Sequence, residues 1–207
     1  MTGLAYIAFE GIEGCGKSTQ ATTLVERLTA AGCDVVATRE TGGTAIGSRI
    51  RDVLHDPTNT HLDSIAEALL IAGDRAQHRA EVLSPALSSG RLVVSDRSVH
   101  STIAYQGYGR ELPLDMVRTV NDWALGGRWP DLVILLDISH VEAMTRLRSR
   151  NLDRFEQEDE SFFLRVRNGF HLMAEKDPSR WVVIDAMASR DDIAADVWRT
   201  VAGRLGL

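Results

Sequence analysis

Short apolar runs alternate with longer amphipathic stretches along the whole chain. Five of the runs, each six or seven residues long, are LAYIAF (4–9), DVVATR (34–39), RLVVSD (91–96), DLVILLD (131–137) and RWVVID (180–185). Continuous apolar runs of this length are typical of strands that are buried on both faces of a sheet. The pattern therefore predicts a sheet of about five strands.

The stretches between these runs carry apolar residues at helical spacing. They predict helices over about 17–31, 45–54, 64–87, 141–150 and 161–176, and from about residue 190 onward. Pro85 lies in the third of these, where we expect the helix to be interrupted. Strands that alternate with helices indicate a parallel sheet with helices on both faces. No repeat or proline-rich linker divides the chain, so we expect a single α/β domain over residues 1–207.

Acidic side chains stand at or just past the ends of the predicted strands. They are Glu10, Glu40, Asp96 and Asp137. In open parallel sheets ligands bind beyond the carboxyl ends of the strands. We therefore expect the functional site at this edge.

The segment GIEGCGKS (11–18) matches G-x-x-x-x-G-K-[ST] at every position, directly after a predicted strand and at the start of a predicted helix. The glycines let backbone N–H groups approach phosphates, and the helix N-terminus adds partial positive charge. Lys17 is expected to reach the β- and γ-phosphates, and the Ser18 hydroxyl to bind Mg²⁺. The alternative is an ordinary glycine-rich turn between strand and helix.

A phosphate-binding loop does not by itself separate kinases from other nucleotide-binding proteins. Switch GTPases need DxxG and NKxD motifs, which this chain lacks, and a large motor needs a longer chain. A small-molecule kinase needs a second anion site. Asp96 at the end of a strand could orient the water shell of Mg²⁺, and Arg97 beside it could bind an acceptor phosphate. The alternative for this pair is a buried salt bridge at a strand end.

The global composition narrows the classes further. The formal net charge is −6 with a pI of about 5.5, which argues against a duplex nucleic-acid binder. The two cysteines form no CxxC pair, and the histidines show no zinc spacing, so we expect reduced thiols and a cytoplasmic protein. The apolar run at 4–9 is too short for a signal peptide or a membrane span.

With these pieces in place, the chain resembles the thymidylate kinases, especially the bacterial form with arginines in the lid. The segments that carry the resemblance occur in the family's order and are FEGIEGCGKSTQ, TRETGGT, DRAQH, DRSVHSTIAYQG, PDLVILLD and RSRNLDRFEQED. The resemblance implies the nucleoside-monophosphate kinase fold with a phosphate-binding loop and a lid at about 148–159. It implies transfer of the γ-phosphoryl group of ATP to dTMP with Mg²⁺, and a homodimer with no nucleic-acid or membrane partner.

The resemblance also implies roles for individual residues. Arg51 and Arg97 would grip the phosphate of dTMP, while Arg75 and Gln106 would hydrogen-bond the thymine edge. Ser101 and Thr102 would contact the nucleotide near the base, which Ile71 would face. Glu40 and Asp96 would hold Mg²⁺ or its waters together with Ser18. The expected ATP-binding residues are Gly11, Ile12, Glu13, Gly14, Cys15, Gly16, Lys17, Ser18 and Thr19 in the loop, with Arg146 and Ala186 near the adenine.

The lid bears on the catalytic mechanism. One branch of the family has an arginine in the phosphate-binding loop, where this chain has Gly14 after Glu13. The other branch takes its arginines from the lid, and here Arg148, Arg150 and Arg154 are available. We expect Arg154 to close over the transferred group, because charge neutralisation dominates phosphoryl transfer.

Three positions depart from the family pattern. Thr41 replaces the usual proline, Ile71 replaces an aromatic residue that stacks on thymine in many members, and Ser98 replaces an aromatic residue or histidine. Losing the stacking contact with the base reduces the binding free energy by up to roughly 1–3 kcal/mol. Two alternatives therefore stay open: a kinase for another pyrimidine monophosphate, and a nucleotide-binding regulatory protein with a degraded acceptor site.

Overall fold

A computed structural model describes residues 4–147 and 153–207 of the chain. Its sheet has five strands, which are β1 (Tyr6–Glu10), β2 (Val35–Arg39), β3 (Leu92–Asp96), β4 (Leu132–Asp137) and β5 (Trp181–Asp185). The strands lie in the order β2-β3-β1-β4-β5, and every neighbouring pair is parallel. The predicted α/β fold with a parallel sheet of about five strands is confirmed.

The central strand β1 sets the position of the functional edge. All of its residues are buried, as its apolar run predicts. Phe9 near its end lies opposite Asp96 of β3 and Ile134 of β4. The carboxyl ends of the three central strands therefore meet at one edge, where the acidic residues of the sequence gather.

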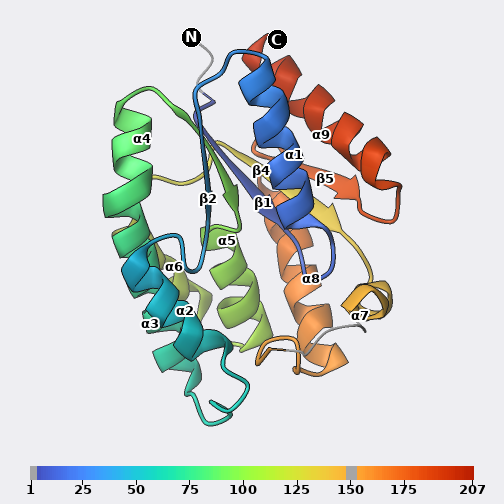
Figure 1. The fold of residues 1–207 in the computed structure, drawn as a ribbon. Helices are drawn as coiled ribbons and strands as arrows, with labels where there is room; N and C mark the ends of the chain where they lie inside the picture. The colour runs from blue at the N-terminus through green and yellow to red at the C-terminus, as the bar shows by residue number, and fades with distance from the viewer. Residues whose placement is uncertain (1–3, 148–152) are drawn as a thin grey trace.

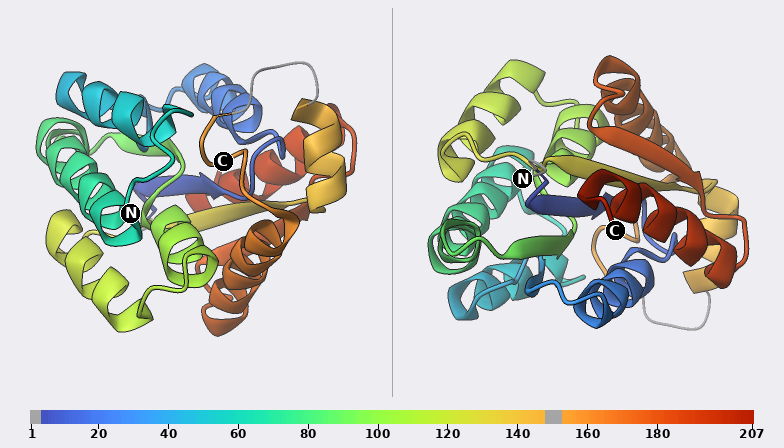
Figure 2. Two further views of the ribbon diagram at one scale, coloured as in Figure 1. Left: turned by 90° about the horizontal axis from the view of Figure 1, so that it is seen from below. Right: turned by 90° about the horizontal axis from the view of Figure 1, so that it is seen from above.

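Helices cover both faces of the sheet (Figure 1). The helices are α1 (Lys17–Ala30), α2 (Ala45–His55), α3 (Ser64–His78), α4 (Ser84–Ser88), α5 (Val99–Thr102), α6 (Leu114–Leu125), α7 (His140–Leu147), α8 (Glu160–Lys176) and α9 (Arg190–Leu205), with π-helical turns η1 (Arg79–Leu83) and η2 (Ile103–Gly109). Figure 2 shows α1 and α9 together over one face and η2 and α8 over the other, with α2, α3 and α6 grouped beyond the β2 side. No helix within the described ranges is long and apolar enough to cross a bilayer.

The predicted break near Pro85 lies earlier in the chain than expected. The helical path continues from α3 to α4, and the irregular part is the π-helical turn η1 at Arg79–Leu83. Pro85 falls in the first turn of α4, where its missing N–H group is tolerated. Its ring would clash with the carbonyl four residues earlier, at Glu81, and the wider π turn accommodates that carbonyl.

The segment after β3 holds helical structure that the apolar pattern did not predict. Helix α5, turn η2 and helix α6 follow one another between residues 99 and 125. Turn η2 packs tightly on α8, because a methyl group built on Gly109 would lie 2.6 Å from the ring of Phe162. Long-range packing therefore overrides the weak local preference of this β-branched and glycine-rich segment.

Candidate active site

The phosphate-binding loop connects β1 to α1. Gly11 has φ of 136°, and a methyl group built on it would lie 2.5 Å from the carbonyl oxygen of Leu136. Both observations require glycine at this position. The loop ends at Gly16, which caps α1 without a side-chain hydrogen bond, so the first N–H groups of the helix remain available to an anion.

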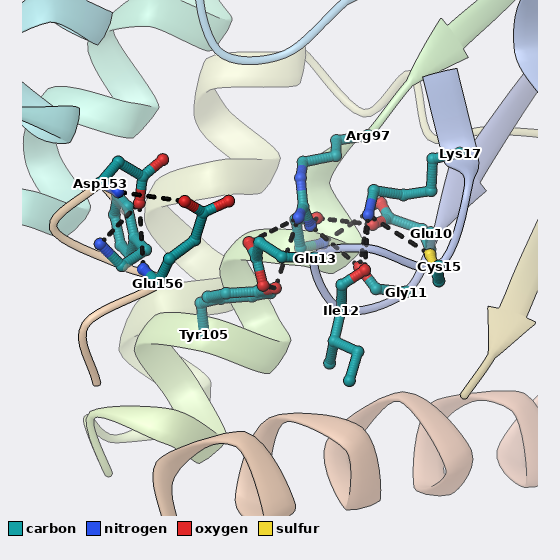
Figure 3. Close-up of polar contacts among 12 residues, drawn as sticks. Glu10, Gly11, Ile12, Glu13, Cys15, Lys17, Arg97, Tyr105, Asp153 and Glu156 are labelled. Atoms are coloured by element: carbon teal, nitrogen blue, oxygen red, sulfur yellow. Dashed lines mark hydrogen bonds and ion pairs between the residues drawn. The ribbon is translucent and has the colours of Figure 1, made fainter. Parts of the chain in front are cut away.

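Lys17 folds back over this loop (Figure 3). Its ammonium group donates to the carbonyl oxygens of Gly11 at 3.0 Å and Ile12 at 2.8 Å, and it lies 3.5 Å from the sulfur of Cys15. The side chain is 7% exposed. The positive charge is thus already held within the loop, where a β- or γ-phosphate would take over from the weaker carbonyl acceptors.

Ser18 and Asp96 form the part of the site that fits a magnesium ion. The Ser18 hydroxyl donates to the Asp96 carboxylate, which joins the start of α1 to the end of β3. Hydroxyl and carboxylate oxygens are ligands that Mg²⁺ accepts, and the ion usually completes its shell with phosphates and waters. In the described part of the chain no group of three or more His, Cys, Asp and Glu side chains is placed to hold a metal. The remaining ligands would thus come from nucleotide phosphates and water.

Glu40, the other predicted magnesium residue, is 3% exposed and engaged on both oxygens. Its carboxylate accepts from Nε of Arg75 at 2.8 Å and contacts Nδ1 of His78 at 2.9 Å. Burial disfavours the charged form, but Arg75 and His78 outweigh it and lower the pKa of Glu40. A role towards Mg²⁺ would act through waters in the adjoining cleft, because both carboxylate oxygens already have partners.

Arg97 is the centre of a charged cluster at the end of β3. Its Nη2 donates to Glu13 at 2.7 Å, and the Tyr105 hydroxyl donates to the other oxygen of Glu13 at 2.6 Å (Figure 3). Its Nη1 donates to the carbonyl of Gly11 at 3.2 Å and to the Ser101 hydroxyl at 2.9 Å. Burial opposes the guanidinium charge, but Tyr105 and the carboxylates around it raise the pKa of Arg97. Arg97 therefore presents a permanent positive charge beside the phosphate-binding loop.

Glu10 connects the strand before the loop to the segment after β3. It is fully buried and accepts from the hydroxyls of Ser98 at 2.8 Å and Ser101 at 2.6 Å. Burial raises the pKa of Glu10, although these hydrogen bonds oppose the rise. The departure at Ser98 thus has a local reason, because a short hydroxyl side chain fits against this buried carboxylate.

A cavity opens beside Arg97, and about 460 Å³ of empty space lies within it and its open mouth. It brings together the residues predicted for the acceptor, which are Arg51, Ile71, Arg75, Arg97, Ser101, Thr102 and Gln106. The hydroxyl of Thr102 is buried and has no hydrogen-bond partner among the described residues. A buried hydroxyl without a partner costs free energy, which a ligand's polar group in the cavity would recover.

A wider and more polar cleft adjoins this cavity along the phosphate-binding loop. Lys17, Ser18 and Asp96 line the cleft, while Arg51 and Arg97 line both spaces. Burial and the nearby charges of Arg39 and Arg97 lower the pKa of Arg51. The carboxylates of Asp153 and Asp96 offset only part of this effect on Arg51, so a bound phosphate at the junction would stabilise its charge further.

Arg146 ties the loop to the segment after β5. Its Nη2 donates to the carbonyl of Ala186 at 2.9 Å, and its Nη1 lies 3.5 Å from the carbonyl of Gly14. Arg146 and Ala186, both predicted near the adenine, therefore lie together beside the phosphate-binding loop.

Arg154 does not face the phosphate-binding loop in this structure. It is 8% exposed, donates to Glu67 at 2.6 Å and to the carbonyl of Leu54 at 2.8 Å, and lies over the ring of Phe155. The neighbouring Asp153 and Glu156 line the phosphate cleft instead. Arg148 and Arg150, the other predicted lid arginines, lie outside the described residues. A catalytic contact by Arg154 would require its segment to leave Glu67.

Several site residues were not predicted. Arg39 and His55 line the phosphate cleft, Tyr105 completes the cluster around Glu13, and Glu67 joins Gln106 to Arg154. Arg39 could have been suggested by its place at the end of a predicted strand, beside Glu40. Tyr105 could have been found by its helical spacing from Ser101, but no local pattern marks Glu67.

Comparison with known proteins identifies the family of the chain. The sequence profile of the thymidylate kinase family matches residues 9–197. The chain is 47% identical to the thymidylate kinase of Halothermothrix orenii, with 99% of each protein covered, and 44% identical to that of Syntrophotalea carbinolica, with 98% of this chain and 97% of the relative covered. The crystal structure of thymidylate kinase from Ehrlichia chaffeensis superposes with a TM-score of 0.78 at 32% identity, covering 96% of this chain and 98% of that one. These similarities show that the chain belongs to the thymidylate kinase family.

Proposed function

We propose that this chain transfers the γ-phosphoryl group of ATP to dTMP, giving ADP and dTDP for dTTP synthesis. The observation that carries the proposal is the junction of two spaces, the polar cleft along the phosphate-binding loop and the less polar cavity beside it, which meet at Arg51 and Arg97. ATP phosphates in the cleft and a nucleotide monophosphate in the cavity would meet there. An ionised phosphate oxygen of dTMP is the nucleophile, so no protein general base is needed.

Mg²⁺ belongs to the same proposal. Ser18 and Asp96 would hold it, directly or through water, with Glu40 reaching only its water shell. When bound, the ion neutralises charge on the β- and γ-phosphates. Lys17 would bind the same phosphates from the loop, and Arg97 would hold the acceptor phosphate in line. The cytoplasmic location expected from the sequence is part of this proposal.

The test is an assay of ADP release with ATP, Mg²⁺ and a panel of nucleoside monophosphates. We expect kcat/KM for dTMP to exceed the values for dUMP, dCMP and UMP. Greater activity on another pyrimidine would favour the alternative raised by Ile71. ATP binding without phosphoryl transfer to any monophosphate would instead favour a nucleotide-binding regulatory protein.

The proposed catalytic role of Arg154 can be tested by substitution. Arg154→Ala is expected to lower kcat by about 10²–10⁴-fold, because Gly14 leaves the loop without an arginine to meet transition-state charge. KM values should change much less, since this contact forms mainly in the transition state. Arg154→Lys should restore only part of the rate, because a point charge lacks the planar guanidinium.

Arg110→Ala is the matched control for Arg154→Ala. Arg110 also pairs with Glu67, at 3.2 Å, and with Glu158 at 2.6 Å, so its loss disturbs the same buried carboxylate. Pre-steady-state rates separate the chemical step from product release. Equal losses of the chemical step in both variants would mean that Arg154 acts only by anchoring its segment to Glu67.

We also propose a homodimer that uses the exposed side of α3 and α6. These helices pack side by side and leave large apolar side chains in solvent, with Trp123 85%, Ile65 60%, Met116 60% and Leu69 54% exposed. A patch of this kind usually marks an interface. Sedimentation equilibrium should give twice the chain mass, and Trp123→Glu should shift the protein to monomer at micromolar concentration. A wild-type monomer at that concentration would refute the dimer.

A further inference from the structure

Glu67 of α3 is a buried carboxylate on which three side chains from two other segments converge. Its exposure is 0%, and it accepts from Nε2 of Gln106 at 2.7 Å, from Arg110 at 3.2 Å and from Arg154 at 2.6 Å. Two guanidinium groups supply the positive charge that a buried carboxylate needs. The side chain is therefore held firmly and presents a fixed acceptor to Gln106.

This contact determines which way the amide of Gln106 is turned. A carboxylate can only accept hydrogen bonds, so the NH₂ end of the amide must face Glu67. The amide oxygen, Oε1, is left for other partners, and no donor in the described residues is hydrogen-bonded to it. The Gln106 side chain is buried and lines the acceptor cavity. Gln106 thus offers the cavity a hydrogen-bond acceptor.

Arg75 lines the same cavity and has the complementary character. Its Nε donates to Glu40 and its Nη1 to Asn121, while no described residue accepts from Nη2. A guanidinium can only donate. The cavity therefore presents one donor from Arg75 and one acceptor from Gln106 to a bound ring.

We propose that Glu67 is a positioning residue that sets the base specificity of the acceptor cavity. By holding the Gln106 amide with its oxygen towards the ligand, it selects pyrimidines that carry an N3–H donor next to an O4 acceptor. Thymine and uracil have this pair, whereas cytosine has an N3 acceptor next to an N4 amino donor and meets both protein groups with the wrong polarity. This inference rests on the proposed function of the cavity.

The effect of Glu67 on base specificity follows from the freedom that the Gln106 side chain would gain if Glu67 were replaced. Without a fixed acceptor behind it, the Gln106 amide can turn by 180° and present its NH₂ end to N3 of cytosine. Sites built to hydrogen-bond a substrate group reject analogues that lack it by up to about 10⁴–10⁵-fold. Freeing one of the two recognition groups should remove part of that rejection.

The test compares kcat/KM for dTMP, dUMP and dCMP in the wild type and in Glu67→Gln, whose amide can both donate and accept. We expect the dTMP-to-dCMP preference to fall by about ten- to hundredfold, while the dTMP-to-dUMP preference stays within about threefold because these bases share the same edge. Glu158→Gln is the matched control, since it breaks only the other contact of Arg110 and should leave both preferences unchanged.

The outcomes separate this inference from the proposed function. A wild type that does not phosphorylate dTMP refutes the function. A wild type that prefers dTMP, with a folded Glu67→Gln variant whose activity on dTMP and dCMP falls equally or not at all, refutes the role of Glu67. If Glu67→Gln does not fold, Glu67→Asp keeps the charge but withdraws it by one methylene group. The Glu67→Asp variant should lower the dTMP-to-dCMP preference at least threefold. An unchanged preference in that variant would again refute the inference.

Discussion

Replacing Lys17 with alanine is expected to lower kcat by about 10³-fold or more while the protein remains folded. The ammonium group lies in the loop among the carbonyls of Gly11 and Ile12, where it would meet the β- and γ-phosphates. Removing a preorganised charge from the transferring group costs about 10²–10³-fold for one donor, and more where it is the main cation. The measurement is ADP release at saturating ATP and dTMP, together with a single-turnover rate.

The chain supplies a matched control for this change. Lys176 is its other lysine and lies exposed in the last turn of α8. Lys176→Ala should leave kcat within about twofold, which excludes a general effect of removing a lysine. Binding of dTMP to the Lys17→Ala variant should persist, because Arg51 and Arg97 are intact. A folded Lys17→Ala enzyme with kcat within about threefold of the wild type would rule out the proposed mechanism.

Replacing Arg97 with alanine should lower kcat/KM for dTMP by about 10²–10³-fold. Truncating one partner of a fully buried, hydrogen-bonded charge pair costs about 2–5 kcal/mol. The pair of Arg97 and Glu13 is partly buried, at 19% and 15% side-chain exposure, and Arg97→Ala would also lose the contact with the expected acceptor phosphate. Its φ of 72° is unusual for a residue other than glycine, and alanine keeps that backbone cost. Arg97→Lys should recover part of the loss, because it restores the charge without the planar fork.

Whether Arg97→Ala affects dTMP or ATP is as informative as the size of the loss. KM for ATP should rise much less than KM for dTMP, because Lys17 is intact and Arg97→Ala removes only the contacts of Arg97 with Gly11 and Glu13 from the loop. Arg91→Ala is the control at the other end of the same strand, where Arg91 pairs with the exposed Asp34. Titration calorimetry with dTMP alone checks the assignment directly. A larger loss of ATP affinity than of dTMP affinity would place Arg97 on the donor side.

Local chemistry made the loop and the sheet predictable. Gly11, Gly16 and Lys17 are spaced as a phosphate-binding loop requires, and strand–loop–helix follows from their neighbours. The five apolar runs became the five strands because a buried parallel strand has no polar face to interrupt it. Family resemblance placed Arg75 and Gln106 at the base, and the structure brings both to one cavity.

Long-range packing decided structural features that the local sequence pattern could not predict. Turn η2, for example, takes its form against α8, which is distant from it along the chain. An isolated sequence also gave no reason to place Arg154 beside Glu67, because the two lie 87 residues apart and the carboxylate needs positive charge only once it is buried.

The sequence by itself determined the glycine-rich loop at the end of β1, whose spacing predicts phosphate binding. The tertiary structure alone decided which side chains line the cavity predicted for the acceptor and which side chains hold them in place. Glu13 accepts hydrogen bonds from Arg97 and Tyr105, and Glu67 accepts one from Gln106. The physical reason is that a backbone motif depends on residues that are adjacent in the sequence. Buried charged side chains instead pair with whichever groups the folded chain brings close to them.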